Sequence, residues 1–116
     1  MKELETIQNI VDESLRLDLF SNLIKQLNKD LALANIDLNF NDDVTPTRLL
    51  VILQESIYRL IQEQFIDYLN LLYIIDISEE LVKQQDGSDA LMLSKNVTYL
   101  VLKRVWKKVW YKYYYN

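Results

Sequence analysis

The chain of 116 residues contains no cysteine and no histidine. Without cysteine it cannot form disulfide bonds, thiolate metal sites or a cysteine nucleophile. Without histidine it lacks the commonest general base near neutral pH and the commonest transition-metal ligand. A single glycine also excludes the glycine-rich loops that bind phosphates and dinucleotides. We therefore expect a protein that is not an enzyme, with no catalytic residue, no metal site and no cofactor.

Glycine and proline occur once each, as Gly87 and Pro46. Tight turns and β-hairpins use glycine for its positive φ, so a chain with one glycine is poorly suited to a hairpin-rich β fold. Half of the residues are hydrophobic and 26% are charged, the balance of a soluble globular domain. The composition and length predict a single all-α domain over residues 1–116, a compact bundle of four or five helices.

The first third of the chain predicts two amphipathic helices that meet near Asp18. Apolar residues recur there at spacings of three and four, the period of one helix face. These residues are Leu4, Ile7, Val11 and Leu15 in the first segment, and Leu19, Leu23, Leu27, Leu31 and Ala34 in the second. Asp18 either separates two helices or kinks a continuous one, and we favour a break.

Residues 36–44 alternate between apolar and polar side chains, which is the period of a strand. A lone strand would have nothing to pair with, so we interpret this segment as an extended loop that fixes its apolar side chains to the core. A short strand paired across a dimer is the alternative.

Two long helices account for most of the remaining chain, and a short helix ending near Asp86 and Gly87 is expected between them. Thr45 and Pro46 form a start signal, because threonine caps free N–H groups and proline is tolerated at the first helical position. The helix that follows is predicted to run unbroken over about residues 46–75 and to be the spine of the fold. The second long helix is predicted over about residues 89–114, beginning at Ser88 or Asp89.

The unbroken helix over residues 46–75 implies which of its side chains are buried. Its predicted apolar face consists of Leu50, Leu53, Ile57, Ile61, Phe65, Tyr68 and Leu72. Asn70 lies between two leucines in the most apolar segment, so we expect it to be buried with a hydrogen-bond partner. Tyr58, Tyr68, Tyr73 and Tyr99 are interpreted as core aromatics with their hydroxyls at the edge.

The C-terminal end of the second long helix, residues 103–116, is basic and aromatic. It holds five cations, both tryptophans, four tyrosines and no acid. Residues 90–116 carry six cations and no acid, a net +6, whereas residues 1–89 carry seven cations and all seventeen acids, a net −10. The candidate interaction surface on this tail consists of Lys103, Arg104, Trp106, Lys107, Lys108, Trp110, Tyr111 and Lys112.

The tail has a structural and a functional interpretation. In the structural one, which we favour, Trp106, Trp110 and Tyr113 dock on the body and supply most of the docking energy, since each exposed ion pair contributes only roughly 0–1 kcal/mol. In the functional one, the tail engages a partner protein, an anionic membrane surface or nucleic acid. The acidic body argues against nucleic acid because it repels phosphates.

We expect the protein to act through protein–protein interaction or self-association, as a homodimer or other homo-oligomer, because one copy of so apolar a helical chain leaves large side chains uncovered. A binding module whose tail engages an anionic membrane or nucleic acid is the alternative. No apolar run reaches the about 20 residues that span a bilayer, and the acidic N-terminal residues do not form a secretory signal. A cytoplasmic location is therefore expected.

Overall fold

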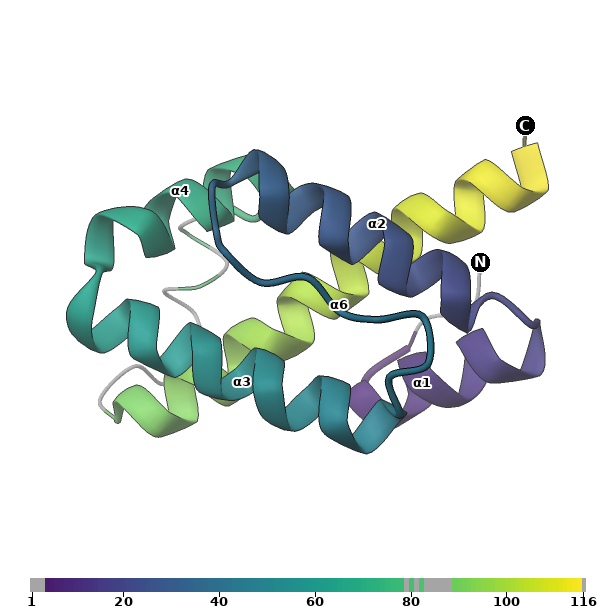
Figure 1. Ribbon diagram of the computed structural model, residues 1–116, viewed down its shortest axis with the longest axis horizontal. Coiled ribbons are helices and arrows are strands. Elements are labelled where there is room, and N and C mark those ends of the chain that lie inside the picture. The colour runs from purple at the N-terminus through teal and green to yellow at the C-terminus, as the bar shows by residue number, and fades with distance from the viewer. Residues whose placement is uncertain (1–3, 79, 81, 83–88, 116) are drawn as a thin grey trace.

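The computed structural model describes residues 4–78, 80, 82 and 89–115. In this part of the chain the secondary structure is entirely helical, and no strand occurs. The helices are α1 (Ile7–Arg16), α2 (Phe20–Leu33), α3 (Pro46–Glu63), α4 (Phe65–Ile75) and α6 (Ala90–Tyr115), arranged as a bundle (Figure 1). The predicted all-α bundle is confirmed. The short helix expected to end near Asp86 and Gly87 falls outside the described residues.

Helix α6 runs through the middle of the bundle and packs against α1, α2, α3 and α4 (Figure 1). The carboxylate of Asp89 accepts a hydrogen bond from the N–H of Leu91 at 2.8 Å, so an aspartate caps the helix where the sequence predicts its start. The buried residues of α6 are Ser94, Val97, Thr98, Leu100, Val101, Leu102, Val105, Trp106 and Val109. The second long helix is thus confirmed, and it, rather than the helix after Pro46, is the centre of the fold.

Three helices end at an aspartate or asparagine with left-handed backbone conformation. Asp18, Asn35 and Asp76 have φ of 58°, 61° and 68°. In each case the N–H of the following residue donates to the carbonyl oxygen five residues earlier, at 2.7–3.0 Å, as in a Schellman motif. Asn and Asp tolerate this conformation better than other residues with a side chain. The chain therefore turns with very little glycine, and the predicted break at Asp18 is confirmed.

The loop over residues 36–44 is held by one side chain of α2. Asn28 accepts a hydrogen bond from the N–H of Phe40 at 2.8 Å and donates to its carbonyl oxygen at 2.9 Å. Phe40 is buried, and Ile36 and Leu38 are partly buried against the core. The predicted extended loop is confirmed, and its backbone pairs with an amide side chain rather than with another strand.

The helix predicted over residues 46–75 is in fact two helices, which is a correction to the sequence analysis. Thr45 caps α3 and Pro46 begins it, as predicted, but Gln64 has φ −140° and ψ 62° and separates α3 from α4. The break lets α4 turn back and pack its apolar residues against α2 and α6 (Figure 1).

The break also changes which side chains are buried. In α4 the buried residues are Tyr68, Leu71, Leu72 and Ile75. Asn70 is exposed, so the expectation of a buried, hydrogen-bonded amide is wrong. Phe65 is 53% exposed and Tyr73 82% exposed, also contrary to prediction, because the new helix axis turns them outward. Leu15 in α1 is likewise 50% exposed, since α1 faces the core with Ile10, Val11 and Ser14 instead.

Candidate functional site

The first half of the basic tail is part of the hydrophobic core. Trp106 is 1% exposed, and Val105 and Val109 on either side of it are buried. The indole N–H of Trp106 has no hydrogen-bond partner among the described residues, so this side chain stabilises the fold by packing. The docked interpretation is confirmed for Trp106 and holds in part for Trp110, which is partly buried against the core. It is wrong for Tyr113, which is 60% exposed.

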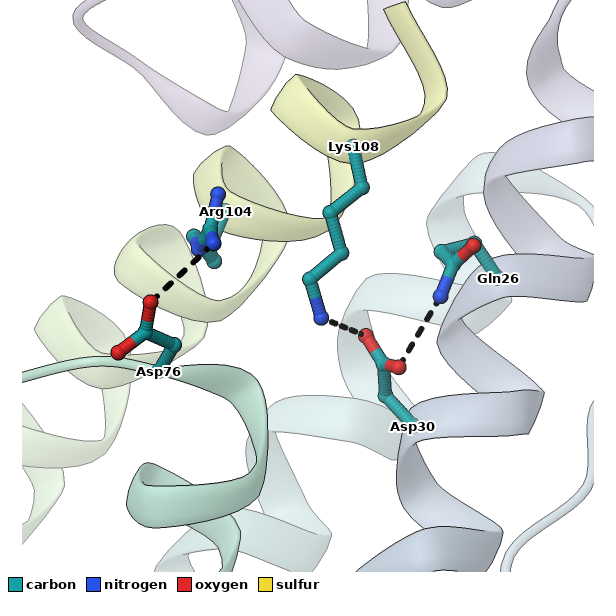
Figure 2. Close-up of polar contacts among 5 residues, drawn as sticks. All are labelled: Gln26, Asp30, Asp76, Arg104 and Lys108. Atoms are coloured by element: carbon teal, nitrogen blue, oxygen red, sulfur yellow. Dashed lines mark hydrogen bonds and ion pairs between the residues drawn. The ribbon is translucent and has the colours of Figure 1, made fainter. Parts of the chain in front are cut away.

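Lys108 reaches a buried carboxylate on α2 (Figure 2). Its Nζ lies 2.9 Å from Oδ2 of Asp30, and Nε2 of Gln26 donates to Oδ1 of the same carboxylate at 3.0 Å. The side chain of Asp30 is 4% exposed and that of Lys108 is 25% exposed. Both carboxylate oxygens are therefore partnered, and the pair connects α2 to α6.

Two further tail cations have partners, one at the end of α4 and one within α6. Arg104 lies 3.2 Å from the carboxylate of Asp76, the residue that ends α4 (Figure 2). Lys103 has its Nζ 5.6 Å from the centre of the Tyr99 ring, a cation–π contact. The hydroxyl of Tyr99 in turn donates to the carbonyl oxygen of Leu4 at 2.8 Å. Arg104 and Lys108 thus connect α6 to acids in the first part of the chain, whereas the contact of Lys103 with Tyr99 lies within α6.

The last turns of α6 form an exposed aromatic cluster, which we call the aromatic end: Trp110, Tyr111, Tyr113, Tyr114 and Tyr115. The ring centroids of Trp110 and Tyr114 are 4.5 Å apart, and Tyr111 stacks on Tyr115 at 5.3 Å. The four tyrosines are 43–73% exposed. In Figure 1 this end of α6 projects beyond the rest of the bundle. The rings thus contact one another more than they contact the core.

The guanidinium of Arg16, in the last turn of α1, is paired with Glu13 of the same helix. The pKa of the Arg16 guanidinium is raised above its ordinary value, first by the hydrogen bond and charge of Glu13 and to a smaller extent by Tyr114. Because the carboxylate of Glu13 balances the positive charge of Arg16, this ion pair adds little net charge to the surface.

An open groove of about 440 Å³, which we call the basic groove, lies between α2 and the end of α6. Its lining consists of Leu19, Asn22, Lys25, Gln26, Lys29, Val109, Lys112 and Tyr113. On each helix these residues recur at the spacing of one face, so the groove follows the sides of two helices. Within the described chain, Lys25, Lys29 and Lys112 form no ion pair.

The structure divides the candidate surface predicted from the sequence. Trp106 is buried, and Lys103, Arg104 and Lys108 contact residues of the protein itself. The members that stay accessible are Lys107, Trp110, Tyr111 and Lys112. Sequence analysis missed Lys25 and Lys29, which α2 places beside Lys112. Their four-residue spacing puts them on one helix face, but only the packing of α2 on α6 shows what that face adjoins.

The described residues contain neither a metal-binding cluster nor a membrane-spanning helix. Nowhere in residues 4–78, 80, 82 and 89–115 do three or more acidic, cysteine or histidine side chains gather closely enough to hold a metal ion. None of the helices described there has the length and apolar character needed to cross a membrane. No family model, curated protein or solved structure matches this chain.

Proposed function

We propose that this chain is a non-enzymatic binding protein that contacts another protein, a partner or a second copy of itself, through the aromatic end of α6. The observation that carries the proposal is the group of four exposed tyrosines, three of which contact Trp110 while the fourth, Tyr113, contacts Tyr114. Tyrosine and tryptophan are enriched in the centres of protein interfaces, where they provide a large contact area together with a polar group. A cytoplasmic location is also proposed, on composition alone.

The anchoring of α6 supports this role. Binding normally requires side chains and backbone to become ordered, which lowers affinity. Here Trp106 and the ion pair of Lys108 with Asp30 fix the helix just before the aromatic end. The tyrosines are therefore presented on a rigid helix, and little ordering free energy is lost when a partner covers them.

Site-specific photo-crosslinking tests the proposal. A benzophenone amino acid replaces Tyr115 in the full chain, and the crosslinked products formed in living cells are identified by mass. The matched control places the same amino acid at Tyr73, which is 82% exposed but lies on α4. We expect a discrete product from position 115 and none from position 73, and its mass distinguishes a second copy from another protein. Equal yields at both positions would show random collision and would refute the proposal.

An anionic membrane surface is the second candidate, because the exposed Lys107 and Lys112 lie near interfacial aromatic residues. The apolar face that such a helix inserts into lipid, here Trp106 and Val109, is already buried in the protein. We therefore expect no co-sedimentation with vesicles of phosphatidylserine and phosphatidylcholine at physiological salt. Salt-sensitive co-sedimentation would favour the membrane over a protein partner.

A further inference from the structure

We propose that the basic groove binds an acidic amphipathic helix of a partner protein. This inference rests on the proposed function, because Tyr113 belongs both to the aromatic end and to the groove. The α2 side of the groove extends from Leu19 to Lys29, which corresponds to about 15 Å of helix. That length accommodates about three turns of a partner helix lying between α2 and α6.

The charge of the groove selects an acidic ligand. Lys25, Lys29 and Lys112 line it, and no acidic residue of the described chain does. Asp30, next to Lys29, is buried and already bound by Lys108 and Gln26, so it does not neutralise the groove. Asp18, next to Leu19, is an exposed acid at the other end of this wall. The first 89 residues carry a net −10. An acidic helix is thus attracted to this groove and repelled by most of the remaining surface, which favours one orientation of binding.

The rest of the lining favours a peptide over a phosphate group. The ring of Tyr113, 60% exposed, provides an apolar contact next to the lysines, whereas Leu19 and Val109 at the base of the groove are 3% and 5% exposed. Phosphate sites typically use the fork of an arginine or the backbone N–H groups at a helix N-terminus. The described lining has no arginine, and both walls are the sides of helices. This combination matches a helix with apolar residues on one face and carboxylates beside them.

Peptide display tests the inference for a partner of unknown sequence. A library of random peptides of about 15 residues, long enough to fill the groove as a helix, is selected against the full-length protein. The strongest binder is then synthesised with a fluorophore and titrated at low and moderate salt. Two variants are compared: K25E/K29E, which reverses the charge of one groove wall, and R48E/K95E, which makes the same change in net charge at exposed cations outside the groove.

We expect the wild-type protein to select peptides that combine Glu or Asp with Leu, and K25E/K29E to weaken their binding about tenfold or more. R48E/K95E should weaken it much less. The inference is overturned if no peptide is enriched, if the enriched peptides lack acids, or if both variants lose affinity equally. It is also overturned if inorganic polyphosphate alone binds in a K25E/K29E-sensitive manner, or if K25E/K29E abolishes self-association of the wild type.

The photo-crosslinking experiment separates this inference from the proposed function. If the product from position 115 persists in K25E/K29E and no acidic peptide is selected, the aromatic end binds a protein but the groove does not take an acidic helix. If position 115 yields no product, the proposed function itself is wrong, whatever the peptide selection shows.

Discussion

Replacing Lys108 by methionine should destabilise the protein more than replacing the carboxylate that it binds. Asp30 has only 4% of its side chain exposed, whereas Lys108 has 25% exposed. In K108M the buried carboxylate keeps one hydrogen bond, from Gln26, and has no opposite charge. In D30N the ammonium group of Lys108 can turn toward water. The two substitutions break the same ion pair, but only K108M leaves a charge buried and unbalanced.

The magnitudes follow from the geometry. At 2.9 Å and an effective dielectric constant of about 20, the attraction between the two charges is roughly 6 kcal/mol, and the desolvation of each ion offsets several kcal/mol of it. The net contribution of the intact pair is therefore small. Removing Lys108 alone should lower the free energy of unfolding by about 2–4 kcal/mol, and removing only the charge of Asp30 by about 1–2 kcal/mol.

Urea unfolding followed by circular dichroism measures these free energies for K108M, D30N and D30N/K108M. The double variant should be more stable than K108M, because the unbalanced carboxylate is gone. The matched control is the pair of Glu55 with Arg59, whose side chains are 64% and 66% exposed and 3.8 Å apart. Its coupling energy should be about 0.3–0.5 kcal/mol. The reasoning is refuted if D30N costs as much as K108M, or if the two pairs give the same coupling energy.

Three further predictions concern the core, the helix ends and the tail. The hydroxyl of Tyr68 is buried with no hydrogen-bond partner among the described residues, so Y68F should unfold at an equal or higher urea concentration, with a gain of up to about 1–2 kcal/mol. Burial raises the pKa of Tyr68 in the folded state. As the pH rises, the hydroxyl of Tyr68 is therefore deprotonated in the unfolded chain before it is deprotonated in the folded protein. Wild type should consequently lose stability relative to Y68F above about pH 10. Asn35 has φ 61°, so N35G should keep or raise the melting temperature, and N35A should cost about 1 kcal/mol. A chain ending at Leu102 loses the buried Trp106 and should show no cooperative thermal transition, whereas one ending at Trp110 should retain it.

Local signals in the sequence were sufficient wherever a side chain acts on its own backbone. Thr45 and Pro46 mark the start of α3, and Asp89 marks the start of α6, because each satisfies or removes N–H groups that the helix leaves free. The break at Asp18 depends on the same kind of local chemistry. The equivalent role of Asn35 and Asp76 could have been read from their positions after apolar helix segments and before an isoleucine.

The break at Gln64 could not be predicted in this way, because no residue around it disfavours a helix. The N–H of Gln64 still donates to the carbonyl oxygen of Leu60 at 2.9 Å, and its own carbonyl oxygen accepts from Tyr68 at 3.0 Å. The break nevertheless leaves the N–H groups of the first turn of α4 without intrahelical partners, and no side chain caps them. What it gains is the burial of Tyr68, Leu71, Leu72 and Ile75 against helices distant in sequence. Asn70 is exposed because α4 buries the opposite face, and the packing of the whole bundle determines which face that is.

The basic end of α6 forms ion pairs with acids of the first part of the chain, while lysines of α2 beside it form no ion pair within the described residues. The helical repeat places these two kinds of residue on different faces. Arg104 and Lys108 are four residues apart and share a face of α6, from which they reach Asp76 and Asp30. On α2, Asp30 points toward α6, whereas Lys29, one residue earlier and about 100° around the helix, lines the groove. Two adjacent residues of α2 thus differ in role: Asp30 holds the tail in place, and Lys29 forms no ion pair with the part of the chain that the structure describes and remains free to contact a ligand. Asp30, which docks the tail, is bound by Lys108 and Gln26 and therefore does not neutralise the neighbouring groove, so the acidic ligand proposed for the groove depends on the same contact that holds the tail.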